Sequence, residues 1–304
     1  ESRISSMNRI TQLIVAIAST AICFATFSAS AADRSMILAT TTSVRDSGML
    51  DSLLPTFTQE TGIEVRVIAV GTGAALRMGR EGNADLLLTH APTAEQVLID
   101  QGIVTRRTPF MQNYFVIAGP ENDPAGIRGA ASPEEAVRRI TQNAAGWVSR
   151  DDDSGTHKRE KALFKSAGIK PDADREGLVR TGTGMGLSLQ VAGQRRAYIL
   201  SDIGTFLAFK KRVDLTTLSK PSKSLLNVYS ILQLESSRFE RPLHSDEAET
   251  LEQFLLEPRI QSEIQRFGVE RFGRPLFTPL FVSGAIPVGH GDSGPTGPPS
   301  AQQD

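Results

Sequence analysis

Residues 36–90 read MILATTTSVRDSGMLDSLLPTFTQETGIEVRVIAVGTGAALRMGREGNADLLLTH. Three segments of this stretch, at 36–39, 63–70 and 84–89, are predicted to be strands. The first and third are short apolar runs, and the second is rich in β-branched residues, which favour strands.

Helices are predicted between these strands. Apolar residues repeat at helical spacing from Met49 to Phe57, and Gly62 stands where a glycine commonly ends a helix. Residues 74–80 can form a second, shorter helix. Strands that alternate with helices in this way predict a parallel, doubly wound sheet.

The same alternation returns after a predicted crossing strand at 113–118. Further helices are predicted at 133–142, 154–167 and 185–195, and further strands at 146–150, 177–181 and 197–201. A second crossing strand at 225–234 and a helix at 246–267 would return the chain to its first half. We therefore predict an α/β protein of two lobes, each with a doubly wound, mainly parallel sheet, hinged by two crossing strands. Lobe 1 is expected to comprise 32–118 and 225–283, and lobe 2 to comprise 119–224.

The two ends of the chain differ in composition from this core. In residues 1–31, Arg9 precedes the apolar run from Leu13 to Phe27, and small residues follow at 29–31, a pattern typical of a cleaved signal peptide. The only cysteine, Cys23, lies within it, so we expect export to a bacterial periplasm without disulfides. Residues 284–304 are rich in Gly, Pro and Ser and are expected to be a disordered tail.

The charge of the chain argues against a polyanionic partner. The formal net charge is -1 over 304 residues, and no block of like charge is longer than the three aspartates at 151–153. We therefore expect no nucleic-acid partner.

Serine, threonine and glycine fill four places where a predicted strand is followed by a helix. The residues expected to bind a ligand there are Thr41, Thr42 and Ser43, Gly71 and Thr72, Ser154, Gly155 and Thr156, and Thr183 and Gly184. The N-terminus of a helix offers unpaired backbone N–H groups and partial positive charge, and a nearby hydroxyl adds a donor. In an open α/β sheet these junctions share the edge at which ligands bind. The sequence therefore predicts a site for a small oxyanion, with no metal and no cofactor.

Arg150 is predicted to supply the formal positive charge of this site. It lies four residues before Ser154, and a guanidinium can donate paired hydrogen bonds to two oxyanion oxygens. Each hydroxyl residue taken singly is explained equally well as a helix cap, so the interpretation rests on the convergence of four junctions. His90 and His157 lack metal-ligand spacing and are interpreted as structural or solvated. Asp85 is expected either to accept a proton from a protonated ligand or to make a cap or ion pair at its strand.

Enzymatic motifs are missing from the sequence. Its glycine motifs at 71–73 and 182–186 lack the third glycine of a dinucleotide-binding loop, and neither a P-loop nor a G-x-S-x-G elbow occurs. Ser154 and His157 lie close in sequence, but no third residue orients them. We therefore expect a binding protein, with an enzyme or sensor on the same fold as the alternative.

An ordered series of motifs resembles a known family. The motifs are Thr40 to Ser43, Asp46 to Gly48, Ala84-Asp85, Thr89 to Pro92, Asp152 to His157, Gly182 to Gly186, and Ala197-Tyr198 followed by Asp202. Over residues 36–272 they resemble the tungstate-binding proteins of ABC importers. The family usually carries a glycine among the acidic residues at the start of the fifth motif, whereas this chain has Asp151 directly before it, so a local difference in that loop is expected.

This resemblance implies a two-lobed, type II periplasmic binding-protein-like fold. It also implies a periplasmic receptor, expected to be a monomer, that delivers tungstate to a membrane permease and its ATPase. The threonine–serine motif and the segment from Arg150 to Thr156 would face the anion. That segment is also similar to phosphate-binding proteins of the same fold, so molybdate, phosphate and sulfate stay open as ligands. Tungstate and molybdate are fully deprotonated dianions at neutral pH, which a site made only of donors suits, whereas protonated phosphate profits from an acceptor.

Overall fold

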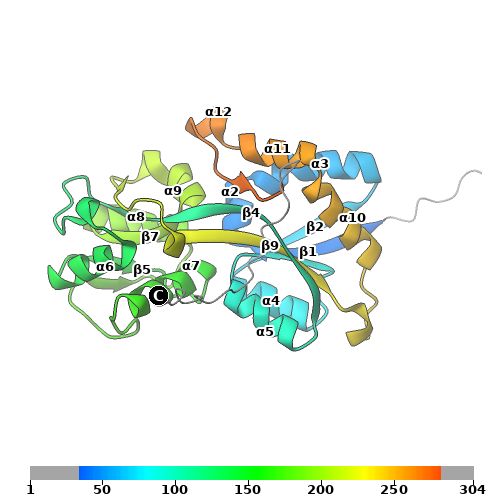
Figure 1. Cartoon of the computed structure of the whole chain (residues 1–304), viewed down its shortest axis with the longest axis horizontal. Helices are drawn as coiled ribbons and strands as arrows, with labels where there is room; N and C mark the ends of the chain where they lie inside the picture. Colours follow the sequence, from blue (N-terminus) through cyan, green and yellow to red (C-terminus); the bar gives the residue numbers. More distant parts are fainter. Residues whose placement is uncertain (1–33, 282–304) are drawn as a thin grey trace, which may run out of the picture. The chain divides into compact units, whose positions relative to one another are not determined.

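Residues 34–281 are described by a computed structural model of the chain, and they form a ten-stranded sheet (Figure 1). The main path of the sheet has the order β2 (Glu64–Val70), β1 (Ser35–Thr41), β3 (Leu86–Thr89), β9 (Leu226–Leu234), β4 (Val104–Gly119), β7 (Tyr198–Asp202), β5 (Trp147–Ser149), β6 (Leu178–Arg180). Two short strands pair with β4 outside this path, namely β8 (Thr216–Thr217) and β10 (Thr278–Pro279). The predicted signal peptide and the predicted tail at 284–304 lie outside the described residues.

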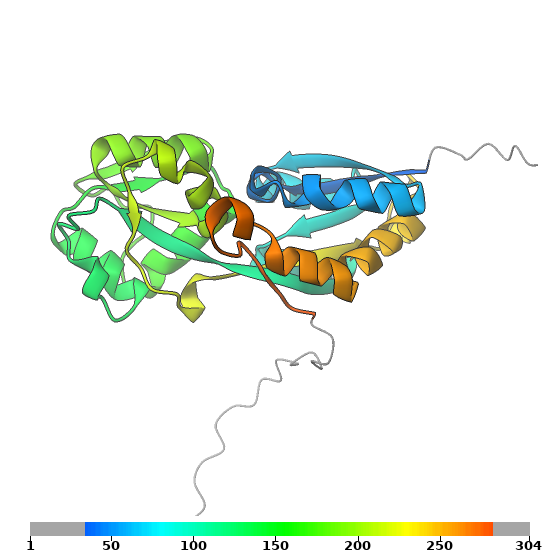
Figure 2. The same ribbon diagram turned by 90° about the horizontal axis from the view of Figure 1, so that it is seen from above.

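Two sets of parallel strands are joined through antiparallel ones. Strand β1 pairs in parallel with β2 and β3, and β5 pairs in parallel with β6 and β7. Between them, β4 pairs antiparallel with β9 as far as Tyr114 and with β7 from Phe115 onward. Figure 2 shows the long strand β4 running from one set to the other. We call the β1–β3 half lobe 1 and the β5–β7 half lobe 2; their exact residue boundaries stay a prediction.

Helices cover both faces of each lobe (Figure 1). In lobe 1 they are α3 (Met49–Thr61), α10 (Ser245–Leu256) and α11 (Pro258–Arg266) on one face, and α4 (Thr72–Arg80) and α5 (Pro92–Asp100) on the other. Successive residues of a strand point to opposite faces. Accordingly, Leu38 and Leu86 pack with Phe57, whereas Ala39 and Leu87 join a separate buried cluster. The first lobe is thus doubly wound, as predicted.

Lobe 2 repeats this construction. Its helices are α6 (Pro133–Gln142), α7 (Gly155–Ser166), α8 (Met185–Arg195) and α9 (Ile203–Phe209). Trp147 packs in the same buried cluster as Phe164 of α7, and the next residue, Val148, packs with Leu189 of α8. Both faces of β5 are therefore buried, which matches its apolar sequence.

Local signals in the sequence set several helix ends. Ser132 accepts a hydrogen bond from the Glu135 N–H at 3.1 Å and Pro133 takes the first helical position, so α6 begins where predicted. Gly62, with φ of 70°, ends α3 in the left-handed conformation. These predictions are confirmed.

Several elements differ from the prediction, among them α9, because no helix was predicted at 203–209. Helix α5 follows β3 although no helix was predicted there. The helix predicted over 246–267 is divided into α10 and α11, because Pro258 disfavours helical geometry at Glu257, whose ψ is 139°. Strand β4 begins at Val104 rather than at 113, and its early part carries arginines that pair with glutamates of helices α5 and α10. The remaining short helices are α2 (Thr42–Ser47), α12 (Val269–Phe272), η1 (Ile127–Gly129), η2 (Lys210–Arg212), η3 (Lys223–Leu225) and η4 (Ser236–Arg238).

Within the part of the chain that the structure describes, we find no helix with the length and apolar character needed to cross a bilayer.

Candidate functional site

A small cavity lies where the junctions of lobe 1 meet those of lobe 2. It is lined by nine of the eleven predicted ligand-binding residues together with two others: Thr41, Thr42, Ser43, Val70, Gly71, Thr72, His90, Arg150, Ser154, Gly155 and Thr156. The space inside it is small, because a water-sized sphere can place its centre in only about 10 Å³, roughly the room that one water molecule needs. This favours a ligand of a few atoms over a sugar or a nucleotide.

Lobe 1 contributes hydroxyl groups to the cavity. Thr41 ends β1 and its Oγ1 lies 3.0 Å from the Oγ of Ser43, in the first turn of α2. Thr41 occupies the N-cap position of α2 but its side chain makes no capping hydrogen bond. The hydroxyl is therefore used for something other than capping, which was the competing interpretation of this junction.

Thr72 gives a second indication from lobe 1. It begins α4, is 1% exposed, and its Oγ1 has no hydrogen-bond partner among the described residues. A buried hydroxyl without a partner loses its hydration and gains nothing in return, and such groups are rare in native proteins. An unpaired hydroxyl in the wall of a polar cavity points to a ligand.

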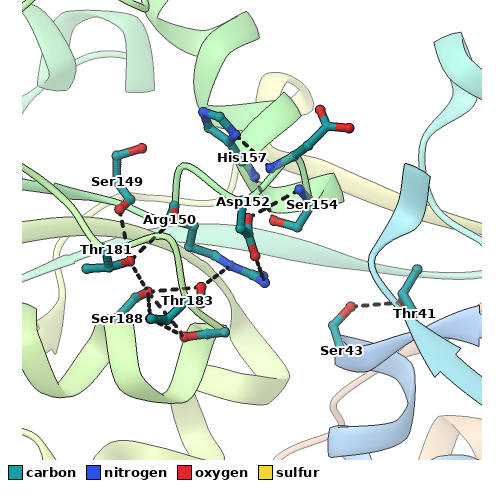
Figure 3. A network of polar contacts seen from close by, with 12 residues as sticks. Thr41, Ser43, Ser149, Arg150, Asp152, Ser154, His157, Thr181, Thr183 and Ser188 are labelled. Atoms are coloured by element: carbon teal, nitrogen blue, oxygen red, sulfur yellow. Dashed lines mark hydrogen bonds and ion pairs between the residues drawn. The ribbon is translucent and has the colours of Figure 1, made fainter. Parts of the chain in front are cut away.

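Lobe 2 contributes the positive charge. Arg150 follows β5, is 5% exposed, and forms an ion pair with Asp152 (Figure 3). Its Nε donates to the carbonyl of Thr183 at 3.4 Å, so the side chain is held from two directions. Figure 3 shows its guanidinium on the side of this network that faces Thr41 and Ser43.

The loop between Arg150 and α7 is held by its own polar groups. Asp152 accepts from the Ser154 N–H at 3.2 Å, and the Ser154 hydroxyl accepts from the His157 N–H at 3.3 Å. For the Ser154 hydroxyl, therefore, the capping interpretation applies. His157 accepts at Nδ1 from the Asp153 N–H at 3.1 Å, and burial lowers its pKa, so its role here is structural.

Two residues of this loop have unusual backbone conformations. Asp151 has φ of 47° and Asp153 has φ of 54°, the left-handed region that glycine enters without steric cost. A glycine in place of Asp151, as in the family that the sequence resembles, would fit the same backbone. Asp151 is anchored instead by its carboxylate, 3.5 Å from Nε2 of His157 and 3.8 Å from Nε of Arg180.

Thr183 and Gly184 do not line the cavity. The Thr183 hydroxyl lies 3.4 Å from that of Ser188, and its carbonyl holds Arg150. Gly184 precedes α8 and lines a neighbouring hollow that Arg150 and, from lobe 1, Thr42 and Gly71 also border. The structure therefore places this fourth junction next to the cavity rather than in its lining; a binding role for all eleven residues stays a prediction.

His90 is the polar lining residue that the sequence analysis did not include among the ligand-binding residues. It is 5% exposed, its Nε2 lies 3.1 Å from the Ser43 Oγ and its Nδ1 lies 2.9 Å from Oδ1 of Asn227. Burial lowers the pKa of His90 to about 4 despite the hydrogen bond to Asn227, and the charges of Arg150 and Arg159 lower it further, so the ring is neutral at pH 7.

The signal for His90 was present in the sequence. It stands between β3 and α5, at the same kind of junction as the four that were singled out, with Pro92 at the first helical turn. Because no helix was predicted at 92–100, the junction was not counted.

Asp85 is placed away from the cavity. Its carboxylate, which is buried, accepts from the Ile37 N–H at 2.7 Å, from Arg241 Nη2 at 2.8 Å and from the His244 N–H at 3.1 Å. Among the described residues that line the cavity, none is acidic. The cavity thus offers hydroxyls, helix N-termini and one formal positive charge.

Such a donor set can hold a buried anion. Fixed dipoles and hydroxyls replace the hydration of an anion when their geometry is set in advance. In the described range 34–281, no group of three or more His, Cys, Asp or Glu residues is arranged to hold a metal ion.

Comparison with known proteins gives consistent matches. A family described as the PBP superfamily domain matches residues 27–255. The tungstate-binding protein TupA of Peptoclostridium acidaminophilum is 41% identical over 247 residues, which cover 81% of this chain and 85% of that protein.

Two solved structures are similar over most of their length. The tungstate-binding protein TupA from Desulfovibrio alaskensis G20 matches with a TM-score of 0.72 at 38% identity, covering 81% of this chain and 98% of that one. The tungstate ABC transporter from Geobacter sulfurreducens matches with a TM-score of 0.67 at 40% identity, covering 74% and 95%. These likenesses confirm the predicted fold.

Proposed function

This chain belongs to the PBP superfamily and to the family of tungstate-binding proteins, and we propose that it is the substrate-binding component of an ABC-type tungstate importer. In this proposal the tungstate dianion occupies the cavity between the two lobes. Backbone N–H groups, Ser and Thr hydroxyls and Arg150 bind it.

The observation that carries the proposal is the composition of the cavity wall. Arg150 is buried there beside hydroxyls from both lobes, the Thr72 hydroxyl is unpaired, and none of the described lining residues is acidic. An anion that carries no proton needs donors only, and this wall supplies donors. Monohydrogen phosphate would bring a proton that the wall can accept through hydroxyls or the neutral ring of His90 but through no carboxylate, so the wall supports tungstate or molybdate ahead of phosphate.

Ser154 and His157, which lie close together in the sequence, do not support turnover of a substrate. The Ser154 hydroxyl accepts from the backbone N–H of His157, while the His157 ring accepts from the Asp153 N–H. The ring is therefore occupied by the loop and is not hydrogen-bonded to the hydroxyl that it would have to activate. We propose a binding protein rather than an enzyme.

The proposal extends to the partners and the location of the protein. Family membership supports delivery of the anion to a membrane permease and its ATPase subunit, and the N-terminal sequence at 1–31 supports export to the periplasm. We propose that the protein acts there as a monomer whose lobes close around the anion.

Calorimetric titration of the purified protein with tungstate, molybdate, sulfate and phosphate tests this function. We expect one tungstate per chain, bound far more tightly than sulfate or phosphate, and the tungstate-to-molybdate ratio measures selectivity between two anions of similar shape. Binding of phosphate alone would identify phosphate as the ligand instead of tungstate. Absence of binding for all four anions would refute the proposal.

A further inference from the structure

The hydrogen bonds around His90 indicate which ring nitrogen carries the proton. The amide nitrogen of Asn227 donates to Oδ1 of Asn113 and to the hydroxyl of Tyr229, both at 2.9 Å. Its oxygen therefore faces Nδ1 of His90, 2.9 Å away, and accepts from it. In the neutral ring this leaves Nε2 as an acceptor.

That acceptor engages the hydroxyls of the anion site. Nε2 lies 3.1 Å from the Ser43 Oγ, which in turn lies 3.0 Å from the Thr41 Oγ1. A hydroxyl has one proton. If Ser43 donates to His90 and accepts from Thr41, both hydroxyl protons of this pair are used within the protein and neither points to an anion.

An oxyanion in the cavity needs the Ser43 proton. When Ser43 turns its O–H to the anion, its remaining lone pairs face Nε2, and two acceptors then oppose each other at hydrogen-bond distance. A proton on Nε2 removes this conflict, because the imidazolium donates to Ser43 while Ser43 donates to the anion.

The charges that face the ring make this protonation depend on the anion. Arg150 at the end of β5 and Arg159 on α7 act on His90 as positive charges, the rings of Phe115 on β4 and Tyr229 on β9 pack against it, and Tyr229 stays neutral because burial raises its pKa. Burial is the main cause of the lowered pKa of His90 and the two arginines lower it further, so the ring is neutral. A dianion adds two negative charges on the same side and offsets both.

We propose that His90 is a positioning residue that takes up one proton from solvent as the dianion binds, so that Ser43 can donate its hydroxyl proton to the anion. This inference rests on the proposed function. The proton comes from the buffer and attaches to Nε2, the Ser43 O–H bond rotates without breaking, and the positive charges next to the dianion become two, those of Arg150 and His90. A monoanion would offset only one of the two arginine charges and would raise the pKa of His90 less, so this proton uptake favours the binding of dianions.

The sign of the resulting pH dependence follows from linkage. The anion raises the pKa of His90 from its value of about 4 in the structure described here. Affinity is then greatest at low pH and falls as pH rises through the pKa of His90 in the complex. Below that pKa and above 4, each anion takes up about one proton and affinity changes about tenfold per pH unit.

Titration of the full protein with tungstate at pH 7, in buffers of different ionisation enthalpy, measures this uptake directly. We expect between about a half and one proton per tungstate. The same titration of His90→Gln, whose side chain donates and accepts but does not titrate, should show no uptake and an affinity that is at least tenfold weaker and independent of pH. His157→Gln is the control, because His157 is a second buried histidine that contacts the Asp153 N–H and lies outside the cavity lining. This variant should keep the proton uptake of the wild-type protein.

The outcomes separate the two proposals. Tight tungstate binding by the wild-type protein with no proton uptake overturns the role of His90 and leaves the proposed function standing. Equal uptake by wild type and His90→Gln assigns the proton to another group and also overturns it. If His90→Gln does not fold, the NMR shifts of the His90 ring in the wild-type protein decide, because an unchanged neutral ring in the tungstate complex contradicts the proposal. Absence of any anion binding by the wild-type protein refutes the proposed function itself.

Discussion

The two walls of the cavity are built differently. The wall from lobe 1 carries Thr41, Ser43 and Thr72 on helix starts with ordinary backbone geometry and, before an anion binds, no formal charge at neutral pH. The wall from lobe 2 carries the charge of Arg150 next to a loop in which Asp151 and Asp153 adopt positive φ. Hydroxyls bind an anion through directional hydrogen bonds, and an arginine adds a formal positive charge to its hydrogen bonds. The difference indicates that neither lobe alone both neutralises and fully hydrogen-bonds the anion, which makes closure part of binding.

Removing the charged wall should have the largest effect. Arg150→Ala is expected to weaken tungstate binding about 100-fold or more, because it deletes up to two charge-assisted hydrogen bonds worth about 1.5–3 kcal/mol each. Arg180→Ala, which removes a nearby arginine outside the cavity lining, serves as the control and should bind as wild type. Calorimetry compares both variants, and near-equal affinities would show that the charge of Arg150 is not used.

Preventing the approach of the two walls should have the next largest effect. A β-carbon at Gly155 of lobe 2 would lie 2.9 Å from Cε1 of His90 and 2.9 Å from Oγ1 of Thr72, both in lobe 1. Gly155→Ala is therefore expected to weaken binding about tenfold, since overpacking typically costs about 1–3 kcal/mol.

Gly184→Ala is the matched control for this substitution. A β-carbon at Gly184 would meet nothing within 4 Å, and its backbone, with φ of -63°, accepts any residue. Small-angle scattering with and without tungstate should show compaction for Gly184→Ala and less for Gly155→Ala. Equal compaction and equal affinity would mean that the walls do not need this contact.

Changing one hydroxyl of lobe 1 should have the smallest effect on binding and an opposite effect on stability. Thr72→Val removes a buried hydroxyl that has no partner, so we expect a free energy of unfolding about 1 kcal/mol higher and tungstate binding about fivefold weaker.

Thr40→Val provides the contrast on β1. Its hydroxyl is buried too, but donates to the Leu88 carbonyl at 2.8 Å and is absent from the cavity lining. That variant should unfold about 1 kcal/mol more easily and bind tungstate unchanged. Denaturant unfolding measures the stability of the two variants and calorimetry measures their tungstate affinity. Equal destabilisation of Thr72→Val and Thr40→Val would contradict the interpretation of the Thr72 hydroxyl as a ligand-binding group.

Most of the fold was predictable because its signals are local. Gly62, Ser132 and Pro133 act through the backbone geometry of their own turns, and the alternation of strands and helices follows from side-chain periodicity. The beginning of β4 was not predicted because its charged residues do not form a typical strand pattern. Arg106 and Arg107 are stabilised there by ion pairs with Glu252 and Glu95, which lie in other elements and are not visible from the sequence of the strand.

The site was predictable as far as its chemistry follows from junction sequences. Nine predicted residues share one cavity, because the ends of parallel strands meet at the same edge. The role of His90 was not predictable, since Asn227, which fixes its ring, lies 137 residues away. The contact of Thr183 with Arg150 likewise depends on how lobe 2 folds, because the Thr183 carbonyl and not its hydroxyl accepts from the guanidinium.

The most direct test of the account is anomalous diffraction at a tungsten absorption edge from crystals of the protein grown with tungstate. The account predicts one strong peak per chain in the cavity, within hydrogen-bond reach of the Arg150 guanidinium on one side and of Ser43 and Thr72 on the other. A peak elsewhere, or a peak that touches one lobe only, would contradict it.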